Sequence, residues 1–139
     1  MKYKKLTPNL SVKDVKETVR FYRDILGFTL EMVVPTGKEQ IEQNLSEGIT
    51  YDYAMMRKGE VFVMFMEEDC FKKDLPFLKD RPHGASLSFY IDVEDIDALY
   101  GSLKGKVAFV KELETTWYGM KEFYIEDCNG YVLGFGEKS

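Results

Sequence analysis

The chain has 139 residues, of which 45% are hydrophobic and 31% charged, a composition that suits one ordinary globular domain. Its 19 basic and 24 acidic residues give a net charge of −5 and are interleaved, so no basic stripe offers itself to a phosphate backbone and we expect no nucleic-acid partner. No apolar run reaches the roughly 18 residues of a membrane span, the start lacks the apolar core of a signal peptide, and the two cysteines form no paired motif, so we expect a cytoplasmic protein without membrane contact.

The first half of the chain combines short strands with one amphipathic helix. Residues 6–12 alternate as a strand does, and residues 13–26 carry apolar side chains at helical spacing, followed by Gly27 where a helix cap is expected. Residues 28–34 favour a strand. The polar stretch 35–50 predicts a long loop with a short helix at 39–45. Residues 50–57 and 61–68 then predict a hairpin that turns at Lys58–Gly59.

The second half repeats this plan after a charged, proline-containing connector at 70–82, for which we expect one or two helical turns. Residues 85–93 predict a strand, 94–105 a helix ended by glycine, and 106–113 another strand. Residues 118–127 and 131–137 predict a second hairpin around Cys128–Asn129–Gly130. Each half therefore has the order β-α-β-β-β.

Local sequence supports an internal repeat. The motif Val-x-Asp-Val/Ile occurs twice at the junction of a strand and a helix, beginning at Val12 and at Val93, with an offset of 81 residues. We predict an α+β fold in which two tandem βαβββ modules, about 5–68 and 84–137, form a curled mixed sheet around a cleft with the helices outside. One helix covers only one face of such a sheet, and the remaining faces and edges lead us to expect a homodimer.

Three separated motifs resemble one superfamily in the right order. They are TPNLSVKDVKETVRFYRDILGF near the start, FYIDVEDIDALYGSL in the middle and WYGMKEFYIEDCNGYVLGF near the end. Together they resemble the vicinal-oxygen-chelate superfamily, which includes glyoxalases, extradiol dioxygenases and the bleomycin-resistance proteins. The resemblance covers nearly the whole chain except 35–50. It implies the fold, but not one chemistry, because this fold hosts many.

The resemblance also locates the metal-binding positions of the catalytic members, which hold a divalent ion with His and Glu side chains from four strands. These positions fall on Thr7, Met64, Ser88 and Gly134. Hydroxyl and thioether groups are poor ligands for such ions, and glycine has no side chain. The flanking residues supply no ligand either, whereas a catalytic site needs about three. The resemblance therefore implies a bleomycin-resistance-like member that works without a metal or other cofactor.

Aromatic and methionine side chains give the best sign of ligand binding, because flat rings and flexible thioethers suit organic molecules. The alternative is that they form an ordinary core. Strand alternation and the resemblance place the candidate ligand-binding residues along a cleft: Asn9, Tyr53, Arg57, Phe62, Met64, Ser88, Tyr90, Trp117, Tyr118, Glu122 and Tyr124.

Two titratable residues are candidates for catalysis. Glu122 should face the cleft, where its carboxylate could hold a cation or act as a base, although an ion pair with Lys121, Lys111 or Arg57 is equally compatible with the pattern. His83, the only histidine, could be a general base or an exposed loop residue. The acidic run 67–69 beside Cys70 could bind a cation, but a solvated strand end is the commoner case.

The first hypothesis is therefore a protein that sequesters an aromatic or cationic small molecule. The alternatives are a lyase, isomerase or dioxygenase of the same superfamily, and a structural interaction module with a filled cleft.

Overall fold

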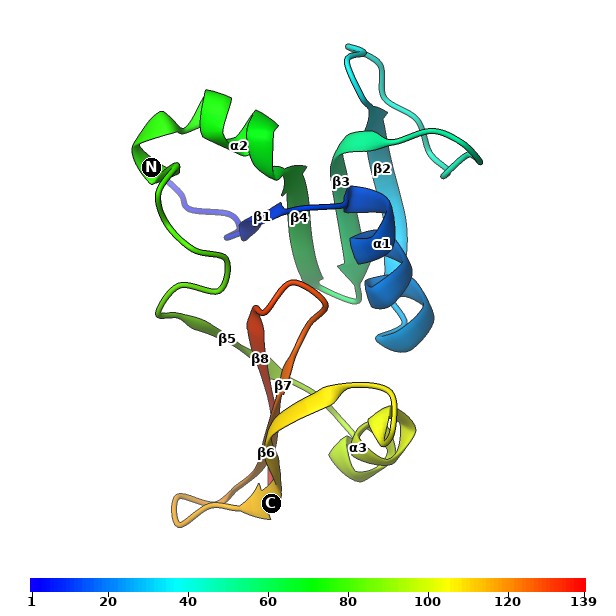
Figure 1. Ribbon diagram of the computed structural model, residues 1–139. Helices are drawn as coiled ribbons and strands as arrows, with labels where there is room; N and C mark the ends of the chain where they lie inside the picture. Colours follow the sequence, from blue (N-terminus) through cyan, green and yellow to red (C-terminus); the bar gives the residue numbers. More distant parts are fainter. The chain divides into compact units, whose positions relative to one another are not determined.

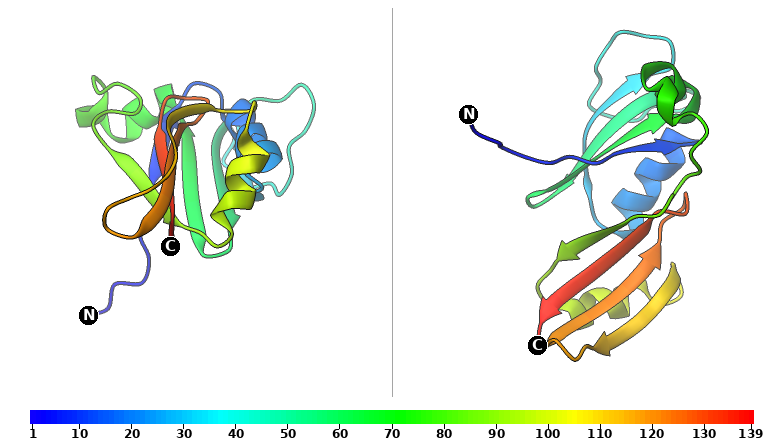
Figure 2. Two further views of the ribbon diagram at one scale, coloured as in Figure 1. Left: turned by 90° about the horizontal axis from the view of Figure 1, so that it is seen from below. Right: turned by 90° about the vertical axis from the view of Figure 1, so that its left-hand side faces the viewer.

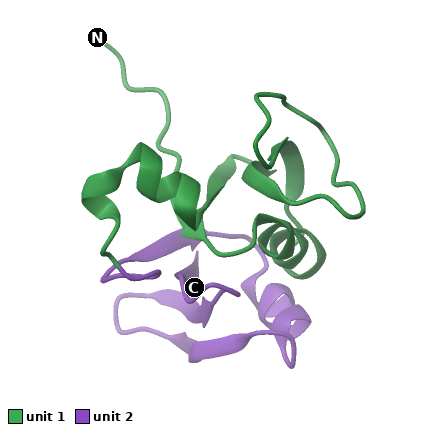
Figure 3. Ribbon diagram, turned by 45° about the horizontal axis from the view of Figure 1, so that its top comes forward, with its two compact units in different colours: residues 1–81 green, residues 82–139 purple.

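The computed structural model describes residues 1–139, which fold into two compact units, residues 1–81 and 82–139 (Figure 3). Each unit contains one four-stranded mixed sheet with a helix between its first two strands, so the predicted α+β fold of two βαβββ modules is confirmed. None of the helices has the length and apolar character that a membrane crossing requires.

The first unit contains four strands and the helical segments that connect them (Figure 1). In chain order these are β1 (Asn9–Val12), α1 (Val15–Arg20), η1 (Phe21–Ile25, a π-helical continuation of α1), β2 (Thr29–Pro35), β3 (Tyr51–Lys58), β4 (Val61–Glu67), α2 (Glu68–Asp74) and η2 (Pro76–Leu78). The sheet has the order β1-β4-β3-β2, with β1 parallel to β4 and the other pairs antiparallel.

The core of the first unit lies between α1–η1 and one face of this sheet (Figure 2). Tyr22 of η1 packs against Phe65 of β4 with ring centroids 4.8 Å apart, and both residues are buried. Because side chains alternate along a strand, residues at 62, 64 and 66 lie on the opposite face. Gly27 ends the helical segment with a φ of +79°, as the sequence predicts.

Two local predictions in this unit are wrong. The stretch 39–45 forms no helix: it is an irregular loop, joined to the sheet by an isolated bridge between Val33 and Glu42. Its two apolar residues, Ile41 and Leu45, are too few to stabilise so short a helix. The β3–β4 turn consists of Gly59 and Glu60 rather than Lys58 and Gly59, because Lys58 still pairs with Val61.

The second unit repeats the arrangement with β5 (Ser88–Asp92), α3 (Ile96–Leu103), β6 (Ala108–Thr115), β7 (Met120–Glu126) and β8 (Val132–Lys138). Its sheet has the order β5-β8-β7-β6, with β5 parallel to β8. Tyr100 of α3 packs against Phe123 of β7 at 5.2 Å, so Phe123 faces the helix and its neighbours Glu122 and Tyr124 face away from it.

The two modules cap their helices differently, although the repeated motif places an aspartate at each start. In the first unit the Asp14 side chain accepts a hydrogen bond from the Glu17 amide of α1. In the second, Asp95 has a φ of +59° and its side chain makes no cap. Glu137 of β8 replaces it by accepting from the amides of Asp95 and Ile96, each at 3.0 Å.

Candidate functional site

In the first unit, the sheet face opposite α1 carries a row of half-buried methionines. Strand pairing places Asn9 beside Met64, Met64 beside Met55, and Met55 beside Met32, so one row crosses all four strands. Asn9 Oδ1 is buried and has no hydrogen-bond partner. This face offers a flexible apolar surface with one unpaired acceptor.

Three further candidates in this unit lie on the same sheet. Arg57 pairs with Phe62 across β3 and β4, and its guanidinium lies 5.5 Å from the Phe62 ring while Glu31 approaches it at 3.6 Å. Lys5, which the sequence did not single out, places its ammonium 3.6 Å from the same ring. Tyr53 lies beside Met66, and burial raises the pKa of its hydroxyl.

In the second unit, the structure gathers three of the predicted residues around the carboxylate of a fourth, Glu122. Glu122 is only 3% exposed. Its Oε2 accepts a hydrogen bond from the Tyr90 hydroxyl at 2.7 Å, and its Oε1 accepts one from the Tyr118 hydroxyl at 2.5 Å. Tyr124 lies beside Tyr90 with ring centroids 6.4 Å apart. The residues Tyr90 and Tyr118 are themselves 45% and 52% exposed, so two accessible tyrosines cover a buried carboxylate.

Two glycines of β8 make room for these rings. A Cβ atom on Gly136 would collide with the hydroxyl end of Tyr90, and one on Gly134 would collide with the Tyr124 ring. Gly136 was not among the residues predicted from the sequence, although glycines at alternate positions of one strand lie on one face and indicate that another group approaches the backbone there.

The carboxylate of Glu122 has no basic partner. The ion pairs considered from the sequence do not form: Lys121 binds Asp97 at 2.5 Å, Lys111 binds Glu114 at 3.2 Å, and Arg57 approaches Glu31. The pKa of Tyr90 is raised by burial of its hydroxyl and, after that, by its hydrogen bond to Glu122. The pKa of Tyr118 is raised mainly by its hydrogen bond to Glu122. Both phenols therefore stay protonated and donate to a negative charge that no cation compensates.

The remaining candidates of this unit lie apart from the carboxylate. Trp117, 95% exposed, packs edge-on against Tyr118 in the β6–β7 turn at 5.2 Å. Ser88 is exposed and begins β5, where it pairs with Val132. His83 stacks on Tyr131 at 6.2 Å, in the turn at the other end of β7 from Tyr118. The structure therefore does not bring His83 together with Glu122.

The residues at the superfamily's metal positions do not fit a divalent ion. Strand pairing places Asn9 beside Met64 and Tyr90 beside Gly134. Thr7 and Ser88, the positions expected from the sequence, lie two residues before Asn9 and Tyr90 along the chain. Asn9 brings one amide oxygen. The Tyr90 hydroxyl donates to Glu122, and the Tyr124 ring fills the space above Gly134. Such a set falls short of the three anionic or imidazole ligands of a catalytic site.

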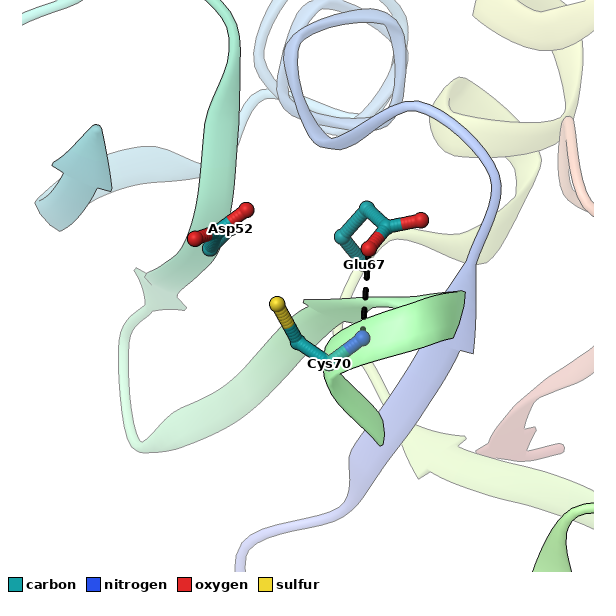
Figure 4. A group of neighbouring side chains, drawn as sticks. All are labelled: Asp52, Glu67 and Cys70. Carbon is teal, nitrogen blue, oxygen red and sulfur yellow. Dashed lines mark hydrogen bonds between the residues drawn. The ribbon is translucent and has the colours of Figure 1, made fainter. Parts of the chain in front are cut away.

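A separate cluster of metal-ligating side chains lies where β4 meets α2 (Figure 4). Asp52, Glu67 and Cys70 place one ligand atom each within 4.8 Å of one another. Glu67 Oε1 already accepts from the amides of Asp69 and Cys70, and thereby caps α2. Burial, followed by the charge of Asp52, raises the pKa of the Cys70 thiol to about 11. Glu67, the last residue of β4, is thus also the N-cap of α2.

Comparison with known proteins identifies a family and a set of folds. A family model described as the glyoxalase/bleomycin resistance protein/dioxygenase superfamily matches residues 6–135. A search of curated proteins finds no significant match.

Solved structures share the fold at low sequence identity. A glyoxalase/bleomycin resistance protein/dioxygenase from Nocardioides has a TM-score of 0.72 at 15% identity, over 99% of this chain and 85% of that one. TioX from Micromonospora sp. ML1 has a TM-score of 0.71 at 17% identity, over 99% and 100%. A bleomycin-binding protein from Streptomyces verticillus, solved with copper(II)-bleomycin, has a TM-score of 0.61 at 20% identity, over 100% and 99%.

Proposed function

The chain belongs to the glyoxalase/bleomycin resistance protein/dioxygenase superfamily, and from this premise we propose that it binds a small organic cation on the tyrosine-lined sheet face of its second unit, without metal chemistry. The observation that carries the proposal is the Glu122 carboxylate, which is buried beneath two phenols and has no basic partner. A buried charge is costly unless compensated, and a bound cation would supply the missing charge.

The neighbouring rings support the same class of ligand. Tyr90 and Tyr118 are exposed and Tyr124 is half-buried beside them, and a cation within about 6 Å of a ring centroid is attracted to the face of that ring. The bleomycin-binding protein of similar fold carries its ligand as a copper(II) complex. We therefore include bleomycin among the compounds to be tested.

An isomerase that uses Glu122 as its base is the less favoured candidate. A general base must reach the proton that it abstracts. Both oxygens of Glu122 instead accept hydrogen bonds from phenols, which lie between the buried carboxylate and a ligand on the exposed face. We accordingly assign Glu122 a binding role.

Thermal denaturation with a panel of aromatic amines, quaternary ammonium compounds and bleomycin tests the proposal. A ligand that binds the folded state raises the midpoint by mass action, and at 100 times its Kd it adds about 2.7 kcal/mol. We expect the shift to disappear in Glu122→Gln. A Glu112→Gln variant serves as the control, because Glu112 contacts Tyr100 on the helix side of the sheet. If no cationic compound shifts the midpoint, or if Glu122→Gln responds like the wild type, the proposal is wrong.

We further propose a cytoplasmic homodimer. The sequence has two cysteines and no paired cysteine motif, in accord with a reducing compartment. Each sheet also ends in two edge strands, β1 and β2 in one and β5 and β6 in the other, and a second copy could cover these edges except at Val33 of β2, which is bridged to Glu42. Light scattering on the purified protein should give twice the mass of one chain.

A further inference from the structure

The way in which Glu122 is satisfied restricts the kind of cation that the site can hold. Each carboxylate oxygen already accepts one phenol hydrogen, Oε2 from Tyr90 and Oε1 from Tyr118. The remaining lone pairs belong to a residue that is only 3% exposed. A ligand that approaches this face therefore meets the two phenols and their rings, and not a bare carboxylate.

The charge of the carboxylate still acts on that surface. Tyr90 and Tyr124 lie 6.4 Å apart and are inclined by 57°, so one cation can lie within about 6 Å of both centroids. The Tyr124 ring already attracts a cation, because Lys111 Nζ lies 5.9 Å from its centroid. The ammonium group of Lys111 also forms an ion pair with Glu114 of the same strand, β6, at 3.2 Å.

We propose that the site selects a quaternary ammonium group, or another organic cation without N–H donors, over a primary ammonium group. This inference rests on the proposed cation-binding function and defines its ligand. A primary ammonium is a strongly hydrated point charge with three donors that need acceptors once water is removed. Each oxygen of Glu122 already accepts a hydrogen bond from a phenol, and its remaining lone pairs are buried. A quaternary ammonium loses no hydrogen bonds on transfer to aromatic faces, where recognition depends on the ring electrostatics alone.

Benzylamine and benzyltrimethylammonium form a matched pair of probes, because they differ only in the methylation of the nitrogen. Trp117, the single tryptophan, lies 5.2 Å from the Tyr118 ring and reports binding by its fluorescence. We expect the wild-type protein to bind benzyltrimethylammonium about tenfold more tightly than benzylamine, a ratio within the range of a cation–π contact. Calorimetric titration provides a second readout that does not depend on the tryptophan.

Two variants test the cause of this selectivity. Tyr118→Phe keeps the ring but frees Oε1 of Glu122, and Tyr90→Phe does the same for Oε2. We expect either change to bring the affinity for benzylamine up to that for benzyltrimethylammonium, since a carboxylate oxygen becomes available to the ammonium donors. Tyr100→Phe, which removes a hydroxyl bound to Glu112 on the helix side, should leave the ratio unchanged.

The outcomes separate this inference from the proposed function. If benzylamine binds wild-type protein as tightly as benzyltrimethylammonium, cations still bind but the selectivity argued here is wrong. An unchanged ratio in both phenylalanine variants, with thermal melts that show them folded, would also overturn it. If neither probe binds up to its solubility limit while bleomycin shifts the melting midpoint, the function survives and this inference fails. If no cation binds at all, both fail.

Discussion

At the scale of single residues, the tyrosine-lined face depends on two glycines whose missing side chains leave space for rings. An alanine at position 136 would force its Cβ against the hydroxyl end of Tyr90. We expect Gly136→Ala to lower the free energy of unfolding by about 1–3 kcal/mol, the usual cost of overpacking, and to displace the Tyr90 hydroxyl from Glu122. Chemical denaturation measures the first effect, and the ultraviolet titration of tyrosine measures the second.

Gly101 provides the control for this substitution. It lies in the middle of α3, with no atom within 4 Å of an added Cβ. Gly101→Ala should therefore raise stability by about 0.5–1 kcal/mol, as expected for glycine in a helix interior. Equal stability losses in the two variants would show that Gly136 has no special packing role.

Cys70 and Cys128 should differ sharply in reactivity. The thiolate is the reactive form, and a pKa of about 11 leaves Cys70 almost wholly protonated at neutral pH. Cys128 is exposed in the β7–β8 turn. In alkylation with iodoacetamide followed by mass spectrometry, we expect Cys128 to be modified at pH 8 and Cys70 to follow only as the pH approaches 11. Asp52→Asn removes one of the charges that raise the pKa and should accelerate the modification of Cys70. Equal rates at pH 8 would contradict this assignment.

The sequence predicts a residue's side of a strand better than it predicts that residue's partners. Alternation correctly directs Glu122 and Tyr124 away from the helix-facing Phe123. It could not distinguish an ion pair from two phenol donors, because Tyr90 lies 32 positions away and its reach depends on strand register. Register likewise brings Tyr90, and not Ser88, beside Gly134. Such pairings arise from tertiary structure, which a local pattern does not contain.

At the scale of elements, the repeated βαβββ plan is visible in the sequence because each helix and strand has a clear period. The segment 39–45 is the exception: its polarity is compatible with a loop or a short helix, and the structure forms a loop held by the Val33–Glu42 bridge. The repeated aspartates have different roles in the two units. Asp14 caps α1, but α3 is capped by Glu137 from a distant strand.

Because a carboxylate, Glu137, caps α3, its contribution to the stability of the fold should depend on pH. Hydrogen bonds from the amides of Ile96 and Asp95 lower the pKa of Glu137. Its contribution is therefore complete above the pKa of an unfolded glutamate, about 4.3, and is lost as the pH falls through the lower folded value. We expect Glu137→Gln to lower the melting midpoint at pH 7, and the difference from wild type to shrink below pH 4. A constant difference over this range would show that the charge of Glu137 plays no part.

Asp14→Ala gives the matched comparison in the first unit. It removes the side-chain acceptor of the Glu17 amide and should cost about 1 kcal/mol at pH 7. Asp95→Gly, by contrast, should cost nothing measurable as a lost cap, because Asp95 makes no side-chain cap and its φ of +59° suits glycine. Denaturant titration of the two variants measures this asymmetry between the modules.

At the scale of the whole molecule, each unit has an aromatic core of its own. Phe65 packs on Tyr22 in the first unit, and Phe123 packs on Tyr100 in the second. Phe65 and Phe123 are both completely buried. Each of these ring pairs lies within one unit, so loss of either ring removes contacts in that unit.

We therefore expect Phe65→Ala and Phe123→Ala each to cost about 3–5 kcal/mol, from lost transfer energy and the cavity left behind. Hydrogen exchange followed by mass spectrometry should then show faster exchange first in strands of the altered unit: β3 and β4 for Phe65→Ala, β7 and β8 for Phe123→Ala. Exchange that rises equally in all eight strands for either variant would show that the two cores open only together. In that case a ligand bound at Glu122 would slow hydrogen exchange in β4 as strongly as in β7. If the two cores open separately, the ligand should slow exchange mainly in the second unit.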